Sequence, residues 1–122
     1  MKTTKMSNNK NAHIITVLFY NDNAISVQEW ANKVFLSRSA LRRKLQDFGS
    51  PKYFIMEHRL TMARKALYNN PCASCEYIAH CAGFSDRTGL QQLLQRYFGI
   101  SYKEFRENPD AYRIITNIPI DK

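Results

Sequence analysis

The sequence has few of the residues from which nucleotide-binding loops, disulfide frameworks and catalytic metal sites are built. It contains 4 glycines, 3 cysteines and 3 histidines among 122 residues. The glycines are too widely spaced to form a phosphate loop or a dinucleotide fingerprint, and no His-Glu-x-x-His array is present. An odd number of cysteines also argues against a disulfide framework. We therefore predict that the protein is not an enzyme and that it needs no cofactor.

Long hydrophobic runs are also missing. A membrane-spanning helix needs about 18 or more consecutive apolar residues, and no stretch approaches this length. The apolar segment 12–20 follows lysines, as a signal peptide would, but it runs directly into polar residues 21–23 without a small-residue cleavage site. We expect a buried helix in this segment, no membrane association, and a cytoplasmic protein.

Acidic residues are scarce. The chain has 10 Asp and Glu against 18 Lys and Arg, a net charge of +8 and a pI near 9.6. Such a chain is attracted to polyanions, either nucleic acid or an anionic membrane surface. Four of the basic residues fall within residues 38–44, in the sequence RSALRRK. This run is the strongest local candidate for an anion-binding surface.

The cysteines form a short cluster, Cys72-x-x-Cys75, with His80 and Cys81 nearby. This spacing resembles half of a zinc site, but no second ligand pair follows at a zinc-finger distance. On a helix, Cys75 and Cys81 would also point in different directions. The sequence therefore favours small apolar core side chains over metal ligands, and we predict no metal site.

Self-comparison reveals a duplicated segment, because residues 26–37 resemble residues 74–85 at an offset of 48. Apolar or small residues occupy positions 27, 30, 31 and 34 and their equivalents 75, 78, 79 and 82, the spacing of one helical face. Each copy begins with a serine suited to cap a helix and ends with a second serine, Ser37 or Ser85, suited to cap the next one. The pattern predicts helix, tight turn and helix, twice over.

The two turns differ at equivalent positions. Gly83 can adopt the left-handed backbone conformation that a steep turn needs, and Phe84 follows as a plug for the corner. The first turn has Phe35 in place of the glycine, so we predict backbone strain there. After each turn, apolar residues line one face of a second helix, which we expect to stop at Gly49 or Gly99.

A single long helix is predicted between the copies, beginning at Pro51 and ending before Asn70-Pro71. Its apolar stripe consists of Met56, Leu60, Ala63 and Leu67. We predict an all-α protein of about seven helices, with two helix-turn-helix subdomains joined by this linker helix. The expected ranges are a flexible arm at 1–11, a first subdomain at 12–50, the linker at 51–69, a second subdomain at 70–108 and a flexible tail at 109–122.

The duplicated unit and the linker helix together resemble the DNA-binding domain of the AraC/XylS family of bacterial transcription regulators. Residues 78–106, IAHCAGFSDRTGLQQLLQRYFGISYKEFR, are similar to the family pattern I-A-x-x-x-G-F-S-D followed by F-G-x-S-x-x-x-[FY]-R. Residues 59–67, RLTMARKAL, resemble its linker-helix pattern R-L-x-x-A-x-x-x-L. Five residues depart from the commoner family residues: Phe35 (small), Gly89-Leu90 (Ser/Tyr-Phe), Gln92 (arginine) and Tyr102 (proline).

This resemblance implies a sequence-specific DNA-binding regulator, most simply an activator that works with RNA polymerase. The chain is similar to the short members of the MarA–SoxS type, which implies binding as a monomer to an asymmetric site in double-stranded DNA. The second helix of each unit would then enter the major groove and act as a recognition helix. The two halves of the site are expected about 34 Å apart, one turn of the duplex.

The contact residues follow from the exposed faces of these two helices. With Leu41 and Leu45 buried, the first helix would turn its basic residues outward. The resemblance implies base contacts by Ser39, Arg42 and Arg43, and we expect phosphate contacts by Arg38 and Lys44. With Leu90 and Leu94 buried, the second helix would present Arg87, Thr88, Gln91 and Gln92. The first helix is thus strongly cationic and the second nearly neutral, which predicts two half-sites of unequal contribution.

Two other functions are compatible with the sequence. The protein could be an interaction protein that antagonises a related activator through protein contacts, which Gln92, Tyr102 and the unusual first turn would allow. It could also be a non-specific, nucleoid-type binder, although such a protein does not need two separately shaped recognition helices. DNA footprinting separates these alternatives, because only a sequence-specific regulator protects a defined site.

Overall fold

The computed structural model describes residues 12–21 and 23–115. These residues form seven α-helices and one short 3-10 turn, and they contain no β-strand. The predicted all-α fold is therefore confirmed. The predicted arm at 1–11 and the end of the predicted tail, 116–122, lie outside the described residues. Within the described ranges, no helix has both the length and the apolar character needed to cross a membrane.

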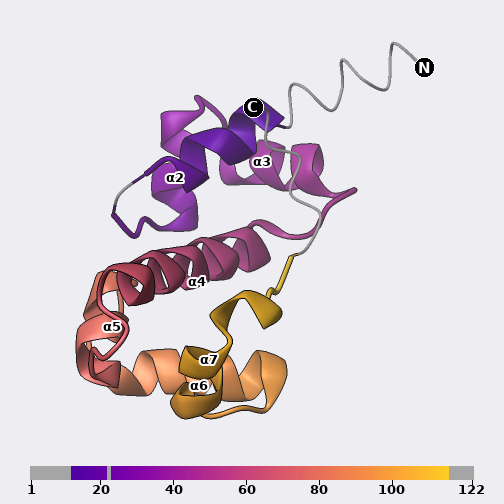
Figure 1. Ribbon diagram of the computed structural model, residues 1–122. Helices are drawn as coiled ribbons and strands as arrows, with labels where there is room; N and C mark the ends of the chain where they lie inside the picture. Colours follow the sequence, from indigo (N-terminus) through magenta and orange to yellow (C-terminus); the bar gives the residue numbers. More distant parts are fainter. Residues whose placement is uncertain (1–11, 22, 116–122) are drawn as a thin grey trace. The chain divides into compact units, whose positions relative to one another are not determined.

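The chain divides into two compact units. Among the described residues, unit 1 consists of 12–55 and Ile115, and unit 2 runs from Met56 to Ile114. Unit 1 contains a helix at 12–19, α2 (Val27–Lys33), α3 (Arg38–Leu45) and the start of α4 (Pro51–Asn69). Unit 2 contains the rest of α4, then α5 (Cys75–Cys81), α6 (Arg87–Phe98), α7 (Tyr102–Glu107) and the 3-10 turn η1 (Pro109–Ala111) (Figure 1).

Trp30 is the centre of the unit 1 core. Its side chain is fully buried, and its indole Nε1–H donates a 2.9 Å hydrogen bond to the backbone oxygen of Ile14. The ring also meets Phe54 edge to face, with 6.0 Å between ring centroids. One side chain therefore ties α2 to both the first helix and the start of α4. This is the core position that the apolar face of the first repeat predicts.

The repeat-equivalent residue, Ile78, has the same role in unit 2. It is fully buried in a core that includes Leu60, Ala63, Leu67, Leu90 and Phe105. The predicted apolar stripe of α4 contributes to this core, with Met56 only partly buried. A single stripe is nevertheless an incomplete description of α4, because the helix also buries Glu57, His58 and Arg64. His58 is a polar residue that the local pattern would place at the surface, yet it is only 2% exposed.

Serine caps begin most of the helices, as predicted, with one exception. Ser26 and Glu29 form a reciprocal capping box at α2, and Ser37 caps α3. The prediction that Ser85 caps α6 is wrong: the N-cap is Asp86, whose carboxylate accepts a 3.3 Å hydrogen bond from the Gly89 N–H. The second turn is thus one residue longer than the first. A carboxylate at this position also interacts favourably with the helix dipole.

The ends of α3 and α6 differ as well. α6 ends at Gly99, which adopts a left-handed conformation (φ 65°), as predicted. α3 ends earlier than we predicted, at Leu45, because the chain turns over residues 46–48 before it reaches Gly49. The Gly49 N–H still donates to the backbone oxygen of Leu45.

The predicted strain at Phe35 is present. Phe35 has φ 59°, the one positive φ at a non-glycine residue in the described part of the chain, whereas Gly83 at the equivalent position has φ 89°. Phe35 is also 93% exposed, so packing does not compensate the strain. Phe84, by contrast, is partly buried against the core of unit 2 and fills the corner as predicted.

Replacing Phe35 with glycine should raise the free energy of unfolding by up to about 1 kcal/mol. Glycine adopts a left-handed conformation without the steric cost of a Cβ, and this gain is reduced by its greater freedom in the unfolded chain. Denaturant unfolding measures the difference. Phe35→Ala is the control, because it removes the exposed ring but keeps the Cβ. If Phe35→Ala stabilises the protein equally, the ring and not the backbone is the source of the cost.

The first part of the predicted flexible tail is folded against α4. Arg64 donates from Nε to the backbone oxygen of Pro109 (3.2 Å) and from Nη2 to that of Tyr112 (2.8 Å). Its Nη2 also lies 2.7 Å from the Glu57 carboxylate, which accepts a 2.6 Å hydrogen bond from the Ile114 N–H. We call Glu57, Arg64 and residues 109–114 the clasp. It corrects our description of residues 109–115 as flexible, because a buried ion pair needs these backbone partners.

Candidate nucleic-acid interface

The exposed face of α3 is cationic. Ser37 sets its start, and Leu41 and Leu45 anchor its inner face by complete burial. Every sequence-predicted contact residue of this helix is exposed: Arg38, Ser39, Arg42, Arg43 and Lys44. Among the described residues, none of the four cations forms an ion pair. Their charge is therefore available to an external anion.

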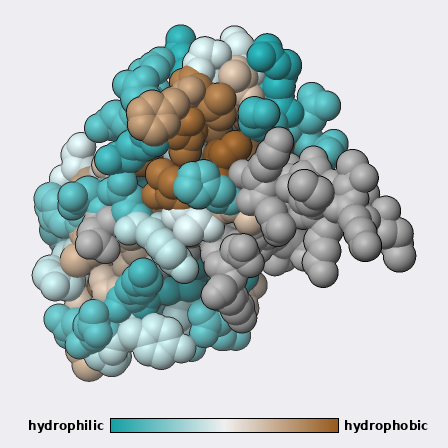
Figure 2. Space-filling model, turned by 90° about the horizontal axis from the view of Figure 1, so that it is seen from above, coloured by the Kyte–Doolittle hydropathy of each residue, from teal (hydrophilic) through white to brown (hydrophobic). Residues whose placement is uncertain are grey.

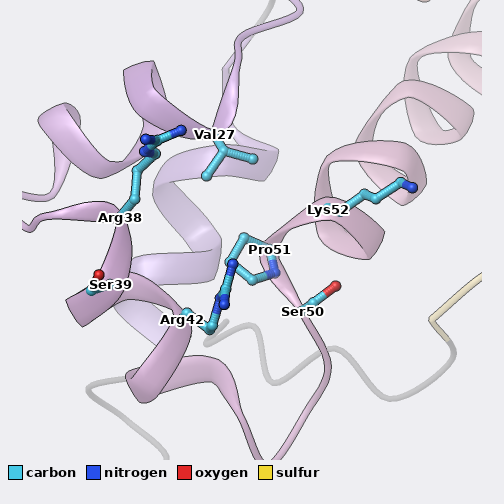
Figure 3. Close-up of a pocket in the computed structure, with 7 residues that line it drawn as sticks. All are labelled: Val27, Arg38, Ser39, Arg42, Ser50, Pro51 and Lys52. Atoms are coloured by element: carbon cyan, nitrogen blue, oxygen red, sulfur yellow. The ribbon is translucent and has the colours of Figure 1, made fainter.

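Part of this face lines a cleft within unit 1. The cleft has a volume of about 520 Å³, and seven residues line it: Val27, Arg38, Ser39, Arg42, Ser50, Pro51 and Lys52. In Figure 3 the Arg38 side chain extends toward Val27, and that of Arg42 toward Pro51. The lining has three cations and two hydroxyl groups but no carboxylate. Guanidinium groups and hydroxyls in this combination suit a phosphate group.

The cleft groups only some of the predicted residues. It brings Arg38, Ser39 and Arg42 together, whereas Arg43 and Lys44 are exposed outside its lining. It also adds Ser50 and Lys52, which we had not predicted. The signal for them was Pro51, because a proline at a helix start places the neighbouring residues at an end that favours anions.

The exposed face of α6 is mostly neutral. Leu90, Leu93 and Leu94 are buried, and the opposite side presents the four predicted contact residues Arg87, Thr88, Gln91 and Gln92, all exposed. These positions are spaced 1, 3 and 1 apart, so they share one face of the helix. Arg87 is the one charged residue among them. The predicted contrast between a cationic α3 and a nearly neutral α6 is present in the structure.

Gly89 allows the turn before α6 to close tightly. A Cβ added at this position would lie 2.6 Å from Cδ1 of Phe84, much closer than side chains tolerate. The Phe84 ring therefore packs directly against the first turn of α6. In this chain the position of the Phe84 ring leaves no room for a Cβ at position 89.

Tyr102 and the cysteines have structural surroundings in unit 2. The Tyr102 hydroxyl donates a 3.1 Å hydrogen bond to the backbone oxygen of Ala73, which accounts for a tyrosine at this position. All three cysteines are free. Cys75 packs partly against the core, where burial raises the pKa of its thiol. Cys72 and Cys81 are exposed, so the prediction of apolar core side chains is wrong for these two.

Metal ligands do not gather in the described part of the chain. No group of three or more His, Cys, Asp or Glu residues there is close enough to hold an ion. What the described surface offers instead is a cationic helix face with a cleft in unit 1 and a polar helix face in unit 2.

Comparison with known proteins also identifies helix-turn-helix relatives of this chain. A helix-turn-helix domain family matches residues 30–108. The HTH-type transcriptional activator RhaS of Escherichia fergusonii is 32% identical over 90 residues, which cover 72% of this chain and 32% of RhaS. The chain therefore spans about a third of the length of that relative.

A solved structure supports the fold. The crystal structure of a DNA-binding transcriptional dual regulator from Escherichia coli K-12 aligns with a TM-score of 0.63 at 20% identity, over 81% of this chain and 90% of that one. At this identity the likeness concerns the fold alone. The family match covers well over half of the chain, from within α2 to the end of α7. The chain therefore belongs to the AraC/XylS family of helix-turn-helix DNA-binding transcription regulators.

Proposed function

We propose that this protein recognises a bipartite site in double-stranded DNA, with α3 contacting one half and α6 the other. The observation that carries the proposal is the pair of exposed faces, each on the second helix of a helix-turn-helix unit and each anchored by buried leucines. We further propose that it binds as a cytoplasmic monomer and activates transcription with RNA polymerase, by analogy with an activator among its relatives.

Unit 1 supplies most of the affinity in this proposal. Arg42 and Arg43 contact base edges, since a guanidinium can donate two hydrogen bonds to guanine O6 and N7, and Ser39 adds a shorter contact. Arg38 and Lys44 contact phosphates on either side of the groove. The cleft supports this division, because its hydroxyl and ammonium groups, from Ser50 and Lys52, give a neighbouring phosphate further donors.

In this proposal unit 2 supplies sequence selectivity, and it contributes less electrostatic attraction to DNA than unit 1 does. Gln91 and Gln92 can each donate and accept in the pairing geometry of adenine N6 and N7. Thr88 can contact a thymine methyl or a base edge, and Arg87 lies at the start of α6, beside the N-cap. With one charge on this face, the second half-site should depend little on salt.

Removing one base contact should change base preference in one half-site only. Arg42→Ala or Arg43→Ala should cost about 1–3 kcal/mol of binding free energy and relax preference in the first half. Gln91→Ala or Gln92→Ala should relax preference in the second half, with an unchanged salt dependence because no charge is lost. Binding to a randomised site library at two salt concentrations measures both effects.

Arg38→Ala and Lys44→Ala are the matched controls. Each should weaken binding to all sequences alike and make the salt slope shallower by about one ion. If the Arg42 and Arg43 variants behave like these controls, α3 is an electrostatic anchor without base contacts. If the glutamine variants also match the parent protein, the proposed base recognition by α6 is wrong.

A second candidate function is an interaction protein that antagonises a related activator. Figure 2 shows one hydrophobic area bordered by hydrophilic residues on the face in view. Phe35 is the most exposed large apolar side chain of the described residues, at 93%. In this second function, the exposed aromatic group on a strained turn would anchor the protein partner. DNase footprinting decides between the two functions, because an antagonist would protect no defined site.

A further inference from the structure

Arg59 is a cation of α4 whose charge has no partner in the described part of the chain. Its guanidinium carbon Cζ lies 5.0 Å from the centroid of the Phe84 ring. The side chain is partly buried, and Nε is buried without a hydrogen-bond acceptor. None of the ion pairs of the described residues includes Arg59. The contrast is Arg64 on the same helix, whose guanidinium has four acceptors.

This arrangement leaves a partly dehydrated charge without compensation. Burial lowers the pKa of the Arg59 guanidinium, yet an arginine stays protonated in proteins. The face of Phe84 offsets part of the lost hydration through a cation–π interaction. The ring offers no negative charge and no lone pair, and the buried Nε–H keeps no acceptor. An anion at the outer edge of the guanidinium, where the terminal nitrogens have no partner among the described residues, would compensate this charge with a charge-assisted hydrogen bond.

The position of Phe84 places this charge next to the recognition helix of unit 2. The ring that Arg59 covers packs against Gly89 in the first turn of α6, where no side chain intervenes. The carboxylate of the adjoining N-cap, Asp86, already accepts from the Gly89 N–H. Arg59 therefore lies beside the start of the helix whose own exposed contact residues include one charge, that of Arg87.

We propose that Arg59, held on the face of Phe84, binds a backbone phosphate of DNA beside the second half-site. The proposal rests on the proposed function, since it takes α6 to lie in the groove. It assigns to the linker helix the phosphate contact that the nearly neutral face of α6 lacks. Gly89 and Phe84 then act as positioning residues, because they set where the guanidinium lies without touching the DNA.

Arg59→Met tests the proposal, because methionine keeps an apolar stem over Phe84 and removes the charge. It should weaken binding to specific and non-specific DNA by about tenfold, as expected for one charge-assisted hydrogen bond. The salt slope should become shallower by about one ion, with base preference unchanged. Lys65→Met is the matched control, since it removes one charge from an exposed position of the same helix. It should leave affinity close to that of the parent protein.

Neutral methylphosphonates, placed one at a time in the operator, locate the contact. One position should weaken binding of the parent protein but not of Arg59→Met. If Arg59→Met does not fold, Arg59→Lys replaces it: this variant should keep the parent salt slope while it loses affinity. Equal affinity losses in Arg59→Met and Lys65→Met, or no position that distinguishes Arg59→Met from the parent, would overturn the proposal.

One further measurement distinguishes a DNA phosphate from free phosphate as the bound anion. A second comparison distinguishes failure of this inference from failure of the proposed function. The Nε–Hε NMR signal of Arg59 should shift when the operator is added and stay in place with inorganic phosphate alone. A shift of the same size with inorganic phosphate would identify a free-anion site and overturn the DNA contact. A parent protein that footprints normally while Arg59→Met matches it contradicts this inference only. A parent protein without a footprint contradicts the proposed function, and this inference with it.

Discussion

Replacing Arg64 with methionine is expected to lower the free energy of unfolding by about 3–5 kcal/mol, the usual cost of removing one partner of a buried ion pair. The variant would leave the Glu57 carboxylate buried without its 2.7 Å partner. It would also remove the donor to the backbone oxygens of Pro109 and Tyr112. Arg113 should offset only part of this loss, because its Nη1 lies 3.9 Å from the Glu57 carboxylate and its side chain is 41% exposed, where water screens its charge. Urea unfolding followed by circular dichroism measures the loss.

Two variants show whether the clasp is the cause. Lys65→Met, one residue away and exposed, should change stability by no more than about 0.5 kcal/mol. The double variant Glu57→Met with Arg64→Met should lose less unfolding free energy than the two single variants added together, because it removes both charges at once. The double variant should still be less stable than the parent protein, since the backbone oxygens of Pro109 and Tyr112 remain without their donor. Additive losses in the double variant would show that Glu57 and Arg64 are not coupled.

Trp30→Ala and Ile78→Ala should each destabilise the protein by about 2–5 kcal/mol, as expected for large-to-small changes in a packed core. Both side chains are fully buried at equivalent positions of the two repeats. Trp30→Ala should be the more costly of the two, because it also removes the hydrogen bond to the Ile14 oxygen and the edge contact with Phe54. Thermal melting measures both.

The milder substitutions at these positions are the controls. Trp30→Phe keeps a ring against Phe54 but loses the donor to Ile14. Its melting midpoint should therefore lie between those of the parent protein and Trp30→Ala. Ile78→Val should cost about 0.5–1.5 kcal/mol. Unchanged melting midpoints in both alanine variants would mean that these residues do not form the cores of their units.

The features that could be predicted from the sequence are those that depend on neighbours close in the chain. Helical periodicity identified the faces of Trp30 and Ile78 because residues three and four positions apart share one side of a helix. The left-handed turn at Gly83 and the strain at Phe35 followed from backbone sterics alone. The choice between Ser85 and Asp86 as the cap of α6 was predicted wrongly, since both can accept the same hydrogen bond and only the turn length decides.

The features that could not be predicted depend on partners far away in the chain. Glu57, His58 and Arg64 are polar residues on a helix, and local pattern places such residues at the surface. The buried Glu57 and Arg64 have their partners in residues 109–114, which are 45 to 57 positions further along. The same limit applies to Cys72, in the turn before α5, and to Cys81, at the end of α5: both are exposed although their side chains are only weakly polar.

The candidate interface shows the same division. The exposed faces of α3 and α6 followed from the buried positions of Leu41, Leu45, Leu90 and Leu94. Lys52 and Arg59 were missed because each becomes a candidate only through a neighbour from another segment, the α3 face in one case and Phe84 in the other. Which bases or phosphates these residues contact stays a prediction for the experiments above.

The clasp sets the order in which the two units can fold during translation. When Glu57 and Arg64 emerge, the backbone groups that complete their hydrogen bonds have not yet been made, because they follow Arg64 by 45 and 48 residues and Glu57 by 57. Helix α4 can form early, but its buried charges must stay hydrated until residues 109–114 arrive. Unit 1 draws its described core almost wholly from residues before position 56 and is free to fold sooner. Translation should therefore yield a nascent chain in which unit 1 resists proteases while unit 2 is still cleaved, until Ile114 has left the exit tunnel.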